Sequence, residues 1–231
     1  MLCKKLFCAA VESMIDAVME GKALQFFDER MMRRCFALAA RSAKQGEYPY
    51  GAVVTRNGEI VAEATNRVAS DHDITRHAEI VALAAAQQRL GSTDLSGCTI
   101  YCNAEPCALC SYAIRESRLA RVVFALRSPV MGGVSRWNIL NDRGLSTAIP
   151  EVFVQPPEVV PGVLAEEADA TLRQVAPFAW AFIRAHGLLL VEPQNGVSQP
   201  ARRSHALIGL LWLTRALRLA LSDRFGRGSG K

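Results

Sequence analysis

The sequence of residues 98–110 reads CTIYCNAEPCALC and joins a strand-like run to a Pro-Cys-x-x-Cys motif. The run from Cys98 to Cys102 is typical of a β-strand, and Pro106 is a favoured residue at the start of a helix. Cys107 and Cys110 are three residues apart, so a helix that begins here carries both thiols on one face. This stretch therefore predicts a strand followed by a helix whose first turn can hold a metal ion.

A second motif, His-Ala-Glu, occupies residues 77–79. It lies near the start of an Ala- and Leu-rich segment that runs from Thr75 without Gly or Pro. This segment predicts a helix that ends near Gly91 and has His77 and Glu79 in its first turn. One histidine and two cysteines supply the three protein ligands of a catalytic zinc site, which keeps its fourth position open for water. Glu79 remains available to move protons beside the metal.

Other interpretations of the cysteines are open. Cys98 and Cys102 could complete a closed, four-thiolate structural zinc site with Cys107 and Cys110, and a Cys-x-x-Cys pair alone could be a redox pair. Glu79 has no role in a closed cluster, so its presence favours catalysis. A structural zinc-binding module remains the non-enzymatic alternative.

Together, the His-Ala-Glu and Glu-Pro-Cys-Ala-Leu-Cys motifs resemble those of the cytidine deaminase-like superfamily of zinc-dependent deaminases, in the branch of guanine deaminase and tRNA adenosine deaminase. The resemblance covers roughly residues 28–160. It implies that His77, Cys107 and Cys110 bind Zn²⁺. It also implies that Glu79 is the catalytic acid and base of a hydrolytic deamination that releases ammonia.

The surrounding pattern predicts the order of the elements. Asp28 is a suitable N-cap for a helix that ends at Gly46, and Asn57-Gly58 is a strong signal for a two-residue hairpin. Further strands are expected at residues 121–126 and 158–160, followed by a helical run broken near Pro177. Hairpin first, then alternating helices and strands, predicts an α/β fold with helices on both faces of a mixed sheet. The resemblance implies a three-layer α/β/α sandwich with a mostly parallel, five-stranded sheet.

We expect three regions in the chain. Residues 1–26 form an N-terminal extension that is helical, residues 27–193 form the deaminase domain, and residues 194–231 form a basic linker and an apolar C-terminal helix. That last helix carries two arginines and is too interrupted for a confident membrane span, but it could make peripheral contact with a membrane or pack on a partner subunit. Acidic residues interrupt the apolar N-terminal run, which argues against a signal peptide. Seven cysteines without disulfide-scaffold spacing fit a cytoplasmic protein.

Four residues are expected to contact the substrate. Asn66 occupies the place where purine-acting members of the superfamily hydrogen-bond the base, although Asn66 could also be a turn former. The backbone of Ala78 and Ala104 is expected near the target amine. Trp137 could stack on a nucleobase, or it could lie in the core or at a dimer interface.

Net charge suggests the size of the substrate. The chain has 27 basic and 22 acidic residues, but residues 194–231 contain seven of the basic residues and one acidic residue. The catalytic region is therefore close to neutral, whereas a tRNA-binding domain normally has a basic surface. We therefore expect a homodimeric enzyme of purine metabolism that deaminates a free nucleobase or nucleoside, with a guanine-like purine favoured. The alternatives are tRNA wobble adenosine-to-inosine deamination and cytosine or cytidine deamination.

Overall fold

The computed structural model describes the backbone of residues 2–191 and the side chains of residues 18–191. Helices and strands alternate after an initial long helix and a hairpin. In chain order the elements are α1 (Leu2–Lys44), β1 (Gly51–Arg56), β2 (Glu59–Thr65), α2 (Ala78–Leu90), β3 (Cys98–Ala104), α3 (Ala108–Glu116), β4 (Arg121–Leu126), the 3₁₀ helix η1 (Ile139–Asn141), α4 (Arg143–Ala148), β5 (Glu158–Pro161), α5 (Ala165–Val175) and α6 (Pro177–Ala185).

The strands form one five-stranded sheet in the order β2-β1-β3-β4-β5. β1 is antiparallel to both of its neighbours, whereas β3, β4 and β5 pair in parallel, so four of the five strands run in one direction. Asn57 and Gly58 both have positive φ angles, 51° and 77°, as a two-residue hairpin turn requires. The predicted hairpin and the mixed, mostly parallel sheet are confirmed.

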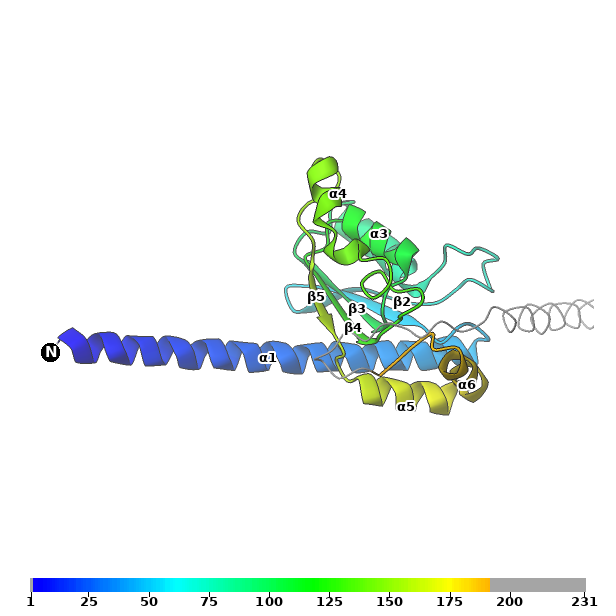
Figure 1. The fold of residues 1–231 in the computed structure, drawn as a ribbon, viewed down its shortest axis with the longest axis horizontal. Coiled ribbons are helices and arrows are strands. Elements are labelled where there is room, and N and C mark those ends of the chain that lie inside the picture. The colour runs from blue at the N-terminus through cyan, green and yellow to red at the C-terminus, as the bar shows by residue number, and fades with distance from the viewer. Residues whose placement is uncertain (1, 192–231) are drawn as a thin grey trace, which may run out of the picture. The chain divides into compact units, whose positions relative to one another are not determined.

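Helices cover both faces of the sheet, which confirms the three-layer α/β/α architecture (Figure 1). Successive strand residues point to opposite faces, so each central strand contributes to two cores. On the face covered by α1, α5 and α6, the buried strand residues include Val53, Tyr101 and Val123. On the face covered by α2 and α3, they include Val54, Ile100 and Val122.

Helix α1 differs from the sequence-based expectation. Asp28 does not cap a helix start, because α1 runs without a break from Leu2 to Lys44. The Asp28 carboxylate is buried and accepts hydrogen bonds from the Arg121 guanidinium at 2.8 and 2.7 Å and from the Tyr101 hydroxyl at 2.8 Å. A residue type that suits a helix cap is used here to attach α1 to the central strands.

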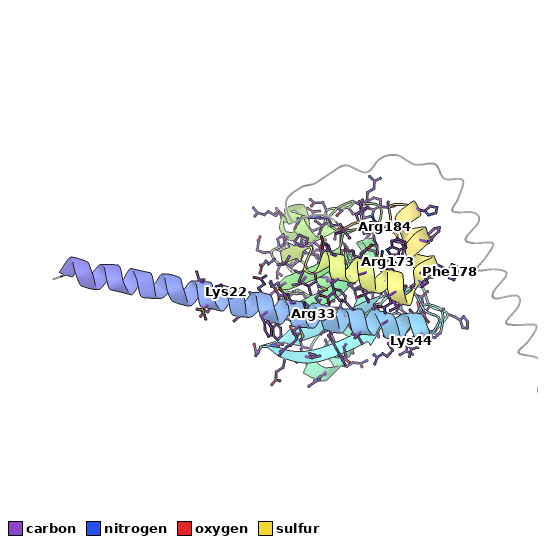
Figure 2. All side chains as sticks on the ribbon, turned by 90° about the horizontal axis from the view of Figure 1, so that it is seen from below. Lys22, Arg33, Lys44, Arg173, Phe178 and Arg184 are labelled. Atoms are coloured by element: carbon purple, nitrogen blue, oxygen red, sulfur yellow. The ribbon has the colours of Figure 1, made fainter. Side chains whose placement is uncertain are left out.

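Contacts between α1 and the rest of the fold begin close to Asp28. Residues 18–26 are exposed, so the boundary expected at residue 27 lies within the continuous helix, close to where its burial begins. Further along, Arg33 donates to both carboxylate oxygens of Glu167 at 3.1 and 3.2 Å. This pair links α1 to α5, and the two helices lie side by side on the same face of the sheet (Figure 2).

After β4 the chain forms two short helices that the sequence did not predict, η1 and α4, before the expected strand and helical run. β5 begins at Glu158 as expected, and the helical run is divided into α5 and α6 by Ala176, with Pro177 at the first turn of α6. The expected linker and apolar helix of residues 194–231 lie outside the described residues. Within residues 2–191, no helix has the length and apolarity that crossing a membrane requires.

Candidate active site

Two helix N-termini carry the candidate metal ligands. His77 is the N-cap of α2 and Cys107 is the N-cap of α3, and neither side chain caps its helix with a hydrogen bond. Cys110 lies in the first turn of α3 and is buried. The helix predicted over residues 75–90 starts slightly later, at Ala78, so His77 precedes its first turn. Both imidazole and thiol are thus free to face a shared ion rather than their own backbone.

The three candidate ligands have distances that fit a tetrahedral zinc ion. The His77 Nδ1 atom lies 3.5 Å from Cys107 Sγ and 3.4 Å from Cys110 Sγ, and the two sulfur atoms are 3.7 Å apart. Zinc–sulfur bonds of about 2.3 Å and zinc–nitrogen bonds of about 2.0–2.1 Å at tetrahedral angles require separations of about 3.8 Å between sulfurs and about 3.6 Å between sulfur and nitrogen. The residues therefore fit Zn²⁺ and leave its fourth position for another ligand.

The ionisation of this cluster favours metal binding. Without a bound metal, the contact with the Cys110 thiol and then that with His77 lower the pKa of Cys107 to about 4. The same contact, together with burial, raises the pKa of Cys110. One thiolate is therefore available at neutral pH, and a cation would draw the proton from the second thiol.

Glu79 lies in the first turn of α2, close enough to the cluster for its charge to interact with Cys107 and His77. Burial, followed by the negative charge of Cys107, raises the pKa of the Glu79 carboxyl to about 7. A carboxyl group with such a pKa can both accept and deliver a proton near neutral pH. The structure thus brings together the four residues of the two motifs.

The other two motif-neighbouring cysteines take no part in this cluster. Cys98 and Cys102 are buried in β3, and both are free thiols. Among residues 18–191, only His77, Cys107 and Cys110 form a group that could hold a metal ion. The closed four-thiolate site considered from the sequence is therefore not formed in the described part of the chain.

Asn66 is buried just after β2, where it is anchored by its backbone N–H, which donates to Tyr50 O at 3.1 Å. Its Nδ2 atom donates to Glu47 Oε2 at 3.0 Å. Glu47, which the sequence did not single out, also accepts hydrogen bonds from the backbone N–H groups of Ala69 and Ser70, at 3.1 and 2.6 Å. Arg67, the next residue after Asn66, pairs through its backbone with Arg76, directly before His77.

Ala78 and Ala104 are both buried at the ends of elements that lead into the site. Ala78 is the first residue of α2, and Ala104 is the last residue of β3. Tyr50 is a further residue of this region that the sequence did not reveal. Burial, and then the negative charges of Glu79 and other neighbours that include Cys107, raise its pKa, so the phenol lies close to the cluster.

A loop after β4 forms the other side of the site and is organised by a buried carboxylate. Glu105 accepts hydrogen bonds from the backbone N–H groups of Ser128, Val134 and Ser135 at 2.7, 2.9 and 2.6 Å. The Ser135 hydroxyl also donates to Glu105 at 2.6 Å. Two residues before Cys107, Glu105 therefore holds residues 128–135 against the start of α3.

Gly132 and Gly133 occupy positions at which any side chain would clash with neighbouring residues. A Cβ atom at Gly132 would lie 2.2 Å from the Glu105 carboxylate, and one at Gly133 would lie 1.8 Å from Ser111 Oγ. Gly132 also forms a β-bridge with Cys107. The absence of side chains at both positions lets the loop approach the candidate ligand closely.

Trp137 follows this loop and remains 56% exposed. Its backbone N–H donates to Gly132 O at 3.1 Å, and the Arg136 guanidinium lies 5.3 Å from the centre of its ring. The structure therefore excludes a core position for Trp137. A surface position leaves its ring accessible to a substrate or to a partner subunit.

Comparisons with known proteins agree with this geometry. Residues 26–126 match the family described as the cytidine and deoxycytidylate deaminase zinc-binding region. The tRNA-specific adenosine deaminase of Aquifex aeolicus is 41% identical over 47% of this chain and 72% of its own length. That of Bacillus subtilis is 37% identical over 63% of this chain and 86% of its own length.

A solved structure of tRNA:A34 deaminases, from work on A-to-I editing at the wobble position of transfer RNA, matches with 28% identity and a TM-score of 0.53. The match covers 62% of this chain and 99% of that one. Two Deinococcus proteins named tRNA(Ile)-lysidine synthase are 36% and 37% identical, but the chain spans only 25% and 24% of their length.

The expectation of a free guanine-like purine substrate is wrong. The relatives at 32–41% identity that match over most of their length are named tRNA-specific adenosine deaminase, whereas the guanine deaminase from Nitrosomonas europaea is 27% identical, with a TM-score of 0.51. The neutral total of residues 1–193 misled because a sum of charges does not show where the charged groups lie, and buried groups of both signs, such as Glu105 and Arg115, enter it.

The fold, the zinc-compatible cluster and these relatives point to one chemistry, the hydrolysis of a C–N bond in a nucleoside with the help of zinc. The chain belongs to the cytidine deaminase-like superfamily of zinc-dependent deaminases.

Proposed function

We propose that this protein is a tRNA adenosine deaminase that converts the wobble adenosine of an anticodon to inosine and releases ammonia. One observation carries the proposal. Relatives that match over 72–86% of their own length, at 32–41% identity, are named tRNA-specific adenosine deaminase. The His77, Cys107 and Cys110 cluster supplies the metal site that such chemistry requires.

In this proposal His77 Nδ1 and the sulfur atoms of Cys107 and Cys110 hold Zn²⁺. When bound, the ion lowers the pKa of a water molecule so that a nucleophile forms near neutral pH. The two helix N-termini direct backbone N–H groups toward the same place, where negative charge develops during attack.

Glu79 is the proposed proton carrier. Its carboxylate takes a proton from the attacking water and passes it to the ring nitrogen beside C6. It then moves the remaining hydroxyl proton to the amine, and the C6–N bond breaks to release ammonia. The oxygen of the water becomes the C6 oxygen of inosine. Burial of the Glu79 carboxyl supports this role, because burial raises its pKa toward neutral pH before a metal ion binds.

Four residues would contact the nucleotide. The amide of Asn66 can hydrogen-bond the purine edge, since an amide both donates and accepts. The backbone groups of Ala78 and Ala104 lie at element ends beside the ligands, where they could reach the amine. The exposed ring of Trp137 could stack on a base.

We further propose that residues 27–193 act as the catalytic domain of a cytoplasmic homodimer. The exposed apolar side chains of Leu109 and Tyr112 on α3, together with Met131 on the following loop, support a protein–protein contact. Light scattering of the full chain measures its mass in solution, and a Tyr112→Glu variant that stays dimeric would argue against this face.

The test of function uses the zinc-loaded full chain and a transcribed anticodon stem-loop with adenosine at the wobble position. We expect inosine in the nuclease digest, and we expect Glu79→Ala to slow its formation by about 10²–10⁴-fold, the usual contribution of a general acid–base group. Glu63→Gln is the matched control, because Glu63 pairs with Arg34 at the surface. Folded, zinc-loaded protein that forms no inosine would overturn the proposal.

A further inference from the structure

Glu47 is a buried carboxylate that no part of the proposed mechanism uses. It lies between α1 and β1 and accepts three hydrogen bonds, from Asn66 Nδ2, Ala69 N and Ser70 N, at 3.0, 3.1 and 2.6 Å. Burial alone would raise the pKa of Glu47, but the hydrogen bonds from Ala69, Ser70 and Asn66 hold it below its usual value. The side chain is therefore ionised at neutral pH and can only accept hydrogen bonds.

Because the ionised Glu47 can only accept hydrogen bonds, it determines which way the Asn66 amide faces. If the Asn66 side chain turned over, its carbonyl oxygen would oppose the Glu47 carboxylate, and two acceptors would meet without a proton between them. The observed orientation donates one N–H of Asn66 to Glu47. The carbonyl oxygen and the second N–H of Asn66 remain for other partners.

The backbone around Asn66 is fixed next to the candidate ligands. Asn66 N donates to Tyr50 O at 3.1 Å, and Arg67 N donates to Arg76 O at 2.9 Å, directly before His77. The backbone of Asn66 is therefore held by hydrogen bonds, and only the orientation of its side chain can vary. An amide with one free acceptor and one free donor matches the amine and the adjacent ring nitrogen of adenine.

We propose that Glu47 is a positioning residue that fixes the orientation of the Asn66 amide toward the substrate base. The inference deepens the proposed function and rests on it, since it needs Asn66 to contact the base. It differs from a purely structural role, in which Glu47 would act only by holding the backbone of Ala69 and Ser70.

A double-mutant cycle distinguishes the two roles. The zinc-loaded full chain is compared with Glu47→Gln, Asn66→Ala and the double variant for kcat and KM on the wobble-adenosine stem-loop. Glu47→Gln should lower kcat/KM by about 10–100-fold, the value of a hydrogen bond to a charged group. In the Asn66→Ala background the same change should alter kcat/KM less than about twofold, because residues that act through each other are not additive.

Glu63→Gln, which removes a partly exposed carboxylate paired with Arg34, serves as the matched control and should leave kcat/KM and zinc content unchanged. Glu47→Asp keeps the charge and should recover part of the loss; if Glu47→Gln fails to fold, Glu47→Asp replaces it in the cycle. If Glu47→Gln lowers kcat/KM by the same factor in the wild type and in the Asn66→Ala variant, the role of Glu47 is overturned while the proposed function stands. A wild type that forms no inosine overturns both.

Discussion

Cys107 is the most accessible cysteine of residues 18–191, because it is partly exposed while Cys35, Cys98, Cys102 and Cys110 are buried. If Cys107 binds zinc, the metal should protect it. We expect iodoacetamide to modify Cys107 first among the cysteines of residues 18–191 after chelation, and zinc to slow that modification at least tenfold. Peptide mass spectrometry with and without zinc provides the measurement.

The control for this experiment is His77→Ala, which removes one ligand and leaves both thiols in place. Zinc should protect Cys107 less well in this variant, because two protein ligands bind more weakly than three. Equal rates of modification with and without zinc in the wild type would contradict the assignment of Cys107 as a ligand.

Single residues also show what a sequence can reveal about such a site. His77, Glu79 and the two cysteines stand out because their side chains and spacing carry the chemistry themselves. Glu47 and Glu105 do not, because their partners lie 19–30 residues away and include backbone N–H groups that carry no side-chain signal. Only the fold makes these carboxylates recognisable.

At the scale of elements, the loop at residues 128–135 depends on Glu105. In Glu105→Gln one carboxylate oxygen is replaced by the amide NH2 group, which cannot accept a hydrogen bond from a backbone N–H. Each backbone N–H that loses its acceptor costs about 1–3 kcal/mol. We expect faster amide hydrogen exchange at residues 128–135, with exchange in α5 unchanged. Glu116→Gln, at an exposed position of α3, is the control, and unaltered exchange in Glu105→Gln would refute the role of this carboxylate.

Arg115 connects α3 to the segment that follows the loop. Its buried guanidinium donates to the carbonyl oxygens of Ile139, Asp142 and Val154 and to the Ser146 hydroxyl, at 2.8–3.3 Å. Arg115→Met should lower the free energy of unfolding by about 2–4 kcal/mol, since several buried acceptors lose their donor. Urea unfolding measures this change, and the exposed Arg143→Met should shift it by less than about 0.5 kcal/mol.

Element boundaries were predictable where local chemistry sets them. Asn57-Gly58 fixed the hairpin because both residues tolerate positive φ, and Pro177 marked the break between α5 and α6. The start of α1 was not predictable in this way. Asp28 has the chemistry of an N-cap, but its partner Arg121 is 93 residues away.

At the scale of the whole molecule, Asp28 joins the outer helix α1 to the centre of the sheet. Asp28→Ala would leave Arg121 largely buried without its main partner, so we expect a loss of about 3–5 kcal/mol in the free energy of unfolding. Arg34→Ala, which breaks the more exposed pair with Glu63, should cost no more than about 1 kcal/mol. Equal effects of the two substitutions in denaturant unfolding would contradict this assignment.

The substrate could not be read from the whole-molecule composition. Net charge adds buried and exposed groups alike, and buried groups of both signs, Glu105 and Arg115 among them, contribute to the sum from positions that no polynucleotide can reach. The fold, by contrast, followed from the order of the hairpin, helices and strands, because alternating elements restrict the possible layers. The order of helices and strands along the sequence predicts the architecture, whereas substrate choice depends on a surface that forms only when the chain folds.

The two carboxylates beside the site hold their loops mainly through backbone N–H groups, those of Ala69 and Ser70 for Glu47 and those of Ser128, Val134 and Ser135 for Glu105. Every residue except proline offers that group. The exposed side chains of Ala69 and Ser70 can therefore be exchanged while Glu47 still holds the backbone of their loop. Sequence variation at these two positions is thus compatible with an unchanged site.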